Sequence, residues 1–154
     1  MSEAAAWIMK VDDSNYASVS QMELVHIINS PETVRVPNAP EHCQNIIVWN
    51  DNILPVVDLA VLFSKTNMST GLDVVAVIIF RDNDDVIHYG GIRLYDSPEL
   101  ETVDNGQVCA IPETPEYLQS VSLSCFINKR GIEVPILDTS KLFGGQFTDE
   151  THRA

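Results

Sequence analysis

Short apolar runs separated by polar turns make up most of this chain. Runs of alternating or β-branched apolar residues at such close spacing are typical of strands rather than of long helices. The pattern predicts about nine strands and three or four short helices, and therefore a mainly β protein of the barrel or sandwich kind. The predicted strands cover residues 7–11, 16–19, 34–37, 46–49, 53–54, 74–80, 86–94, 121–127 and 132–134.

The segments between these strands are predicted as follows. Ser20 can cap a short helix that carries Met22 and runs to Ile28, shortly before Pro31. Residues 64–72 are polar, and they are the expected boundary between two subdomains. Residues 96–107 are predicted to form an acidic loop, and residues 146–154 a flexible tail.

One apolar run stands apart from the others. Residues 74–80 (VVAVIIF) are continuously apolar, too short for a typical helix and rich in β-branched side chains. This combination predicts a strand that is buried on both faces. The strand after it contains Gly90 and Gly91, which indicate a bulge or a close backbone approach.

A nine-residue pattern occurs twice, eighty positions apart. Residues 55–63 read PVVDLAVLF and residues 135–143 read PILDTSKLF, with Pro, Asp, Leu and Phe at matching positions. A strand, a polar turn and a second strand precede each copy. The repeat therefore predicts two similar β modules, each built from a hairpin, an aspartate and a short helix.

Asp58 and Asp138 open the helix of each copy. An aspartate there can accept hydrogen bonds from the free N–H groups of the first helical turn. A catalytic role is the alternative, but two catalytic aspartates are not expected in identical capping contexts. Capping is the favoured interpretation for both.

The composition limits the classes of partner and compartment. The formal net charge of −13 is spread along the whole chain of 154 residues, which argues against binding to nucleic acid or anionic lipid. The N-terminal residues resemble no signal peptide, and no stretch approaches the roughly 20 apolar residues that span a bilayer. We expect a cytoplasmic protein without direct membrane insertion.

The sequence contains no recognisable catalytic or cofactor motif. Phosphate-binding, hydrolase and metalloprotease signatures are absent, so we expect no enzyme activity and no cofactor. The odd number and wide spacing of Cys43, Cys109 and Cys125 fit neither a disulfide framework nor a zinc motif, and Cys125 is expected to be a buried apolar residue. Residues 81–85 are acidic and are interpreted as a solvated turn rather than a calcium loop.

Several segments together resemble the CheW family, the coupling proteins of bacterial chemotaxis arrays. The strongest similarity is the block Pro-Val-Val-Asp-Leu at residues 55–59 with the hairpin before it. The resemblance covers nearly the whole chain. Its other segments are residues 16–25 (YASVSQMELV), 36–40 (VPNAP), 74–80, 89–92 (YGGI) and 136–142.

The resemblance implies a fold and a function. The fold would be a single CheW-like domain over residues 1–154, made of two small five-stranded β-barrel subdomains with a few short helices. Residues 1–66, with part of the C-terminal segment, would form the first barrel and residues 67–145 most of the second. The implied function is a non-enzymatic scaffold that links a chemotaxis-type histidine kinase to the cytoplasmic tip of a chemoreceptor.

The tip of the first hairpin departs from the family pattern. Members of the family usually carry Arg-Gly there, whereas this chain has Asn50-Asp51. The resemblance implies that Met22 and Asn50 take part in receptor coupling, and Trp49 can be a binding anchor beside the tip or a strand residue that covers a barrel end. Our expected partner-binding residues are Met22, Trp49, Asn50 and Asp51.

The altered tip is compatible with a divergent member that serves a specialised array, such as the chemosensory system of a pilus or twitching apparatus. Two other classes remain open. One is a small-molecule-binding β-barrel, which would need a pocket with convergent polar groups. The other is a structural subunit of a different assembly.

Overall fold

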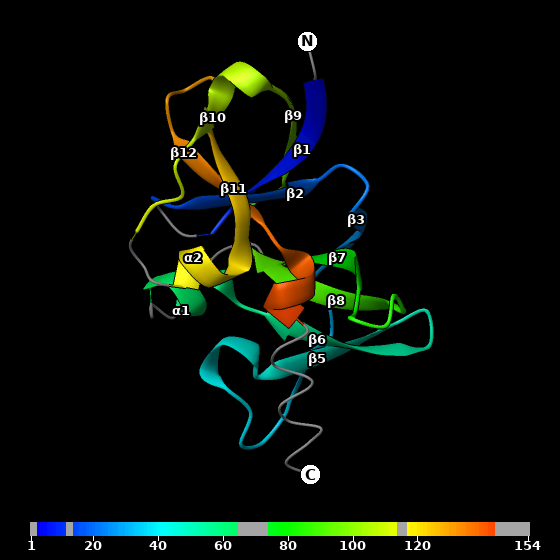
Figure 1. The fold of residues 1–154 in the computed structure, drawn as a ribbon. Helices are drawn as coiled ribbons and strands as arrows, with labels where there is room; N and C mark the ends of the chain where they lie inside the picture. The colour runs from blue at the N-terminus through cyan, green and yellow to red at the C-terminus, as the bar shows by residue number, and fades with distance from the viewer. Residues whose placement is uncertain (1–2, 12–13, 65–73, 114–116, 144–154) are drawn as a thin grey trace.

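The computed structural model describes residues 3–11, 14–64, 74–113 and 117–143, and in these ranges the protein is mainly β. Its strands form two six-stranded sheets, drawn in the upper and lower halves of Figure 1. The first sheet has the order β10 (Val108–Cys109), β11 (Ser122–Ile127), β12 (Glu133–Leu137), β2 (Tyr16–Ser20), β1 (Glu3–Lys10) and β9 (Glu99–Asp104). The second has the order β3 (Leu24–Asn29), β7 (Val74–Arg81), β8 (Ile87–Leu94), β6 (Asn52–Val57), β5 (Asn45–Trp49) and β4 (Val34–Arg35).

Short helices complete the described chain. They are η1 (Glu41–Cys43), α1 (Leu59–Ser64), η2 (Asn105–Gln107), α2 (Tyr117–Val121) and a helical stretch over residues 139–143. None of the helices in the described ranges has the length and apolar character needed to span a bilayer. The predicted mainly β fold, with two strand assemblies and few short helices, is confirmed, although each assembly has six strands instead of five.

The chain passes between the sheets at two places. It leaves the first sheet after β2 and returns to it after β8, so the first sheet combines the first two strands of the chain with the last four (Figure 1). Strands β6 and β7, on either side of residues 65–73, both belong to the second sheet. The strand pairing therefore divides the chain near residues 20–24 and 94–99, which differs from the division predicted between residues 66 and 67. Residues 65–73 themselves lie outside the described chain, as does the predicted tail.

The helix predicted after Ser20 is wrong, because only residues 21–23 form a turn and strand β3 follows. The backbone N–H of Ser20 donates to Oε1 of Glu23 at 3.0 Å, and the N–H of Glu23 donates to the carbonyl of Ser20 at 3.0 Å. These bonds resemble a helix cap but close a single turn. Residues 24–29 (LVHIIN) are rich in β-branched side chains, which favour strands, and they pair with β7.

The acidic loop predicted over residues 96–107 is also wrong in part. Residues 99–104 form β9, which pairs with β1 along six positions at the edge of the first sheet. An edge strand can carry exposed charged side chains, because one of its sides has no neighbouring strand. The polar sequence of residues 99–104 was therefore interpreted as a loop, although it forms a strand.

The second sheet curls strongly. Three strands separate β3 from β5 in the sheet order, which in a flat sheet would place them roughly 19 Å apart. Yet the ring of His26 on β3 stacks on Trp49 of β5 with centroids 5.9 Å apart. The sheet therefore closes around its own apolar interior, which contains Ile47, Leu54, Val56, Val75 and Val77.

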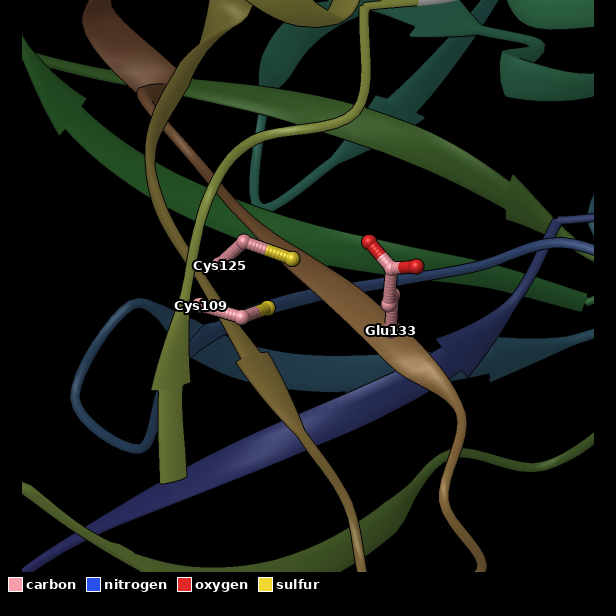
Figure 2. A group of neighbouring side chains, drawn as sticks. All are labelled: Cys109, Cys125 and Glu133. Carbon is pink, nitrogen blue, oxygen red and sulfur yellow. The ribbon is translucent and has the colours of Figure 1, made fainter. Parts of the chain in front are cut away.

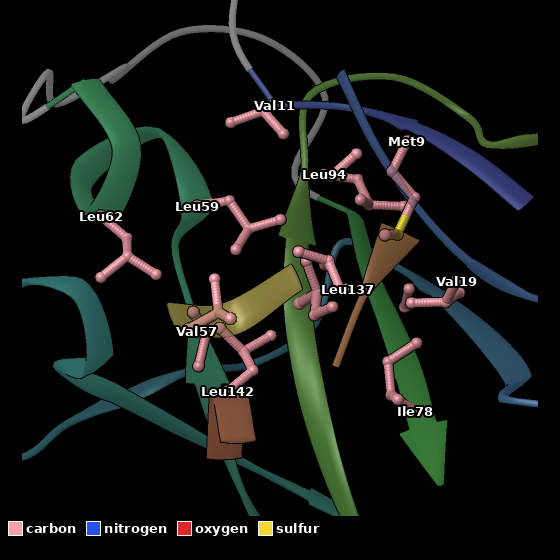
Figure 3. Packing of buried hydrophobic residues seen from close by; sticks show 14 of the residues in the cluster. Met9, Val11, Val19, Val57, Leu59, Leu62, Ile78, Leu94, Leu137 and Leu142 are labelled. Carbon is pink, nitrogen blue, oxygen red and sulfur yellow. The ribbon is translucent and has the colours of Figure 1, made fainter. Parts of the chain in front are cut away.

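Strand β7 is buried on both faces, as residues 74–80 predict. Val75 and Val77 face the interior of the second sheet, whereas Val74, Ala76 and Ile78 face a larger core shared by both sheets. Figure 3 shows residues of that shared core, which come from both sheets and from the short helices. Its labelled members are Met9, Val11, Val19, Val57, Leu59, Leu62, Ile78, Leu94, Leu137 and Leu142.

The two copies of the repeat make equivalent backbone contacts. The N–H of Asp58 donates to the carbonyl of His42 at 2.7 Å, and the N–H of Asp138 donates to that of Val121 at 2.7 Å. The strand before each aspartate also forms the parallel pair of its sheet, β6 with β8 and β12 with β2. The repeat in the sequence is thus a repeat in the structure.

Both aspartates cap the helix that follows them, which confirms the favoured interpretation. Oδ1 of Asp58 accepts from the N–H of Ala60 at 3.0 Å, and Oδ1 of Asp138 accepts from the N–H of Lys141 at 3.2 Å. Asp58 has further partners on β8 and just after it. The hydroxyl of Tyr95 lies 2.9 Å from its Oδ2, and Nη1 of Arg93 lies 3.5 Å from the same oxygen.

Gly90 permits a close approach between the C-terminal helical stretch and β8. A Cβ atom at Gly90 would lie 2.5 Å from Cε1 of Phe143, well inside contact distance. The ring of Phe143 also stacks on Phe80, with centroids 4.8 Å apart and planes 14° apart. The close approach predicted from the two glycines is confirmed, and it joins the second copy of the repeat to the second sheet.

We predict that Leu62→Ala and Leu142→Ala each lower the free energy of unfolding by about 2–5 kcal/mol, because each removes a buried side chain from the shared core. Urea unfolding measures the loss. Leu123→Ala is the control, since Leu123 is 64% exposed and its truncation should cost less than about 0.5 kcal/mol. Losses below about 1 kcal/mol for Leu62 and Leu142 would contradict the shared core.

We also predict that Asp58→Ala costs more stability than Asp138→Ala. The second change removes a cap and should cost about 1 kcal/mol, whereas the first also removes an acceptor for Tyr95 and should cost about 2–3 kcal/mol. In a Tyr95→Phe background the difference should shrink to what the ion pair between Asp58 and Arg93 contributes. Equal costs in the unmodified chain would mean that neither the Tyr95 contact nor the Arg93 contact contributes.

Candidate partner-binding surface

The tip of the β5–β6 hairpin is a two-residue turn made by Asn50 and Asp51. Both have positive φ, 48° and 63°, which is the backbone of a type I′ turn. Asn and Asp tolerate this left-handed region better than other side chains except Gly. The side-chain amide of Asn52 donates to the carbonyl of Asn50 at 3.0 Å and braces the turn. The Asn50-Asp51 tip is therefore a defined structure that presents one carboxylate to solvent.

Trp49 is only partly available to a partner. Its indole is half-buried, stacks on His26 and meets Tyr89 edge to face with centroids 5.3 Å apart. It also packs against the interior of the second sheet. The structure thus gives Trp49 the role of covering that interior, while part of the residue stays exposed beside the tip.

Met22 lies on the turn between β2 and β3, and 82% of its surface is exposed. The neighbouring Glu23 fixes this turn. Its Oε1 accepts from the N–H of Ser20, and its Oε2 accepts from the hydroxyl of Thr139 at 2.6 Å. Thr139 is buried in the second copy of the repeat. Met22 is therefore an exposed apolar side chain on a firmly held turn.

An exposed apolar surface adjoins the tip, and the sequence did not reveal it. Val48 and Ile53 stand opposite each other on β5 and β6, and each is 69% exposed. The strand pairing puts three more apolar residues on the same side of this hairpin and its neighbour β4. We call the set of Val34, Ile46, Val48, Ile53 and Pro55 the apolar hairpin face.

This face could have been suspected from one signal. Residues 46–48 (IIV) are continuously apolar, although only one face of this hairpin lies on the interior of the sheet. Successive side chains of a strand point to opposite faces, so a continuous apolar run there exposes apolar side chains. Exposed apolar groups beside polar residues are typical of protein interaction sites.

The structure brings three of the four predicted site residues into one place. Trp49, Asn50 and Asp51 are consecutive at the end of the hairpin, next to Val48 and Ile53. Met22 lies on a different connection. It is joined to this region through β3, whose His26 stacks on Trp49.

In the acidic turn between β7 and β8, the carboxylate of Asp82 is occupied by hydrogen bonds within the turn and to β8. Oδ1 of Asp82 accepts from the N–H groups of Asp84 and Val86, and its Oδ2 lies 2.7 Å from Nε2 of His88. The hydrogen bond with His88 is the main reason that the pKa of Asp82 is lowered from its usual value. The turn is exposed and internally hydrogen-bonded, which agrees with the predicted solvated turn.

A polar hollow of about 430 Å³ lies beside the first copy of the repeat. Arg35, His42, Asp58 and Arg93 are among its lining residues. Asp58 and Arg93 form an ion pair with each other, and Asp58 also caps α1. The Asp58 carboxylate is therefore already engaged in contacts that hold the fold.

Comparisons with known proteins address the fold and the family. A family model described as the CheW-like domain matches residues 6–88. The crystal structure of the scaffolding protein TtCheW from Thermoanaerobacter tengcongensis is similar, with a TM-score of 0.71 and 14% identity. The alignment covers 89% of this chain and 85% of that one, and it shows that the two proteins share a fold. No curated protein matches this chain.

Proposed function

This chain belongs to the CheW-like domain family, and we propose that it is a non-enzymatic scaffold that couples a chemotaxis-type histidine kinase to chemoreceptors. The family match over residues 6–88 is the observation that carries this function. The solved structure that shares its fold is itself described as a scaffolding protein. We place the protein in the cytoplasm, where the kinase and the receptor tips are found.

The coupling surface that we propose has an apolar centre and a polar end. Val48 and Ile53 supply exposed apolar area in the middle of the hairpin face, and such central side chains contribute most to binding in protein interfaces. The tip formed by Asn50 and Asp51 lies at one end of this face. Met22 supplies a further exposed apolar side chain on the turn before β3, the strand whose His26 stacks on Trp49, and we include it in the proposed surface.

The charge of the tip suggests which receptors bind here. The resemblance to the family implies Arg-Gly at this place, whereas Asp51 adds a negative charge. A carboxylate on an acidic receptor surface would be repelled, and such repulsion costs affinity. The native receptor surface should therefore be less acidic than an ordinary chemoreceptor tip. This supports the finer proposal of a divergent scaffold for a specialised array, such as one of a pilus or twitching system.

Reconstitution tests the function itself. The purified chain should form a complex that contains both a chemotaxis-type histidine kinase and a receptor cytoplasmic fragment from the same organism, and it should change the kinase's autophosphorylation rate. Failure to bind either protein would reject the scaffold function. Turnover of a metabolite by the chain alone would favour the enzyme or small-molecule class.

We predict that Val48→Glu with Ile53→Glu weakens receptor-fragment binding at least about tenfold, because it places charges in the apolar centre of the surface. Both positions are 69% exposed, so the fold should persist. Leu123→Glu is the matched control, since Leu123 is similarly exposed but lies in the first sheet. Isothermal titration gives the affinities. Equal affinity of the unmodified chain, the double variant and Leu123→Glu would mean that the receptor does not bind at the apolar hairpin face.

We predict that Asn50→Arg with Asp51→Gly strengthens binding to an ordinary chemoreceptor tip and weakens, or leaves unchanged, binding to the native partner. Gly suits the φ of 63° at position 51, while Arg at position 50 must accept a φ of 48°. Asp51→Gly alone is therefore the control for the backbone. If the double variant binds the native partner more tightly and gains nothing for the ordinary receptor, the tip does not determine specificity.

A further inference from the structure

Strand pairing at the edge of the first sheet brings together three side chains that are far apart in the sequence. Cys109 of β10 stands directly opposite Cys125 of β11. Glu133 of β12 pairs with Ile127, two positions after Cys125, so it is the diagonal neighbour of Cys125 on the same face. Figure 2 shows the two sulfur atoms on the side of the sheet where the Glu133 carboxylate lies. The two Sγ atoms and a carboxylate oxygen all lie within 4.8 Å of one another.

We propose that Cys109, Cys125 and Glu133 bind one thiophilic divalent cation of the zinc class, with water as the fourth ligand. The linear spacing of the cysteines gives no zinc motif, so the site depends on the pairing of β10, β11 and β12.

The distances fit such an ion after a small adjustment. Zinc lies about 2.3 Å from thiolate sulfur and about 2.0–2.2 Å from carboxylate oxygen, so tetrahedral ligand atoms are roughly 3.3–3.8 Å apart. The separations between the three atoms here need to shorten by about 1.5 Å at most. Changes of side-chain rotamer can supply such a shift, since Glu133 is exposed and Cys109 is only half-buried.

The third residue favours a cation over a disulfide between the two cysteines. A carboxylate has no role in a disulfide, whereas thiolates with a carboxylate form a donor set suited to zinc. A bound cation would offset the proximity of the two thiolates and Glu133.

Exposure across the cluster gives an ion a way in. Cys125 is fully buried and anchors the inner side, while Glu133 is exposed and Cys109 lies between them in exposure. Because β10 has only two residues and pairs with β11 alone, a bound ion would clamp this edge strand to β11 and β12. The bound ion would therefore stabilise the edge of the first sheet, where β10 pairs with β11.

Titration with Co²⁺ and competition by Zn²⁺, under reducing conditions, test the proposal. Tetrahedral Co²⁺ with thiolate ligands gives visible bands and a near-ultraviolet sulfur-to-metal band, and Zn²⁺ should abolish both at one ion per chain. Cys109→Ser and Glu133→Gln should each weaken binding at least about tenfold, in line with the loss of a direct ligand. Cys43→Ser is the matched control, because Cys43 belongs to a different part of the fold, and it should bind as the unmodified chain does.

Two results would overturn the proposal. One is the absence of a thiolate–cobalt band in the reduced, folded chain. The other is a band of equal strength in Cys109→Ser, which would place the ion elsewhere. Circular dichroism confirms that each variant is folded, so a lost band in a folded variant counts as lost coordination. If oxidised protein is two mass units lighter with Cys109 joined to Cys125, and reduced protein binds neither metal, the pair is a redox couple and not a metal site.

Discussion

The two sheets meet across one apolar core, and this contact fixes how the rest of the chain can be arranged. The central strands of both sheets are buried on two faces. Each contributes alternate residues to the interior of its own sheet and to the shared core, as Val75 and Val77 against Ala76 and Ile78 show on β7. On β1 of the first sheet, Ile8 belongs to the interior of that sheet and the next residue, Met9, to the shared core. Because neither sheet can keep these residues away from water alone, the sheets must fold together.

Polar and aromatic contacts fix the orientation of the sheets across that core. The carboxylate of Glu23, at the crossing between the sheets, accepts the hydroxyl of buried Thr139. Phe143 reaches over Gly90 to stack on Phe80. Hydrophobic burial is non-directional, so directional contacts of this kind select one arrangement from many. A scaffold needs that rigidity, because it must hold the β5–β6 hairpin and its apolar face at a fixed place relative to the remainder of the assembly.

Local chemistry made much of this fold predictable. The aspartates at 58 and 138 revealed capped helices, and the apolar run over residues 74–80 revealed a strand buried on both faces. The failures have a common cause. Residues 24–29 and 99–104 become strands through pairing with β7 and β1. The first segment was predicted as a helix because Ser20 and Glu23 resemble a helix cap, and the second as a loop because it is rich in charged residues.

The candidate sites were predictable only where their residues are close together in the sequence. Residues 49–51 are neighbours along the chain, and the resemblance to CheW proteins singled out the tip they form. The apolar hairpin face depends on which side of β5 and β6 lies away from the core. Cys109, Cys125 and Glu133 meet only through the register of three strands. The register of paired strands is difficult to predict from the sequence, because it depends on the packing of the whole sheet.

The claim that both sheets form one cooperative unit has a direct measurement, since each sheet contains one of the two tryptophans of the chain. Trp7→Phe leaves Trp49 to report on the second sheet, and Trp49→Phe leaves Trp7 to report on the first. Within each variant, urea unfolding followed by tryptophan fluorescence and by far-ultraviolet circular dichroism should give one coincident transition. Two transitions, with the fluorescence of one tryptophan changing before the bulk of the β-structure is lost, would show that the sheets unfold separately and would contradict the shared core.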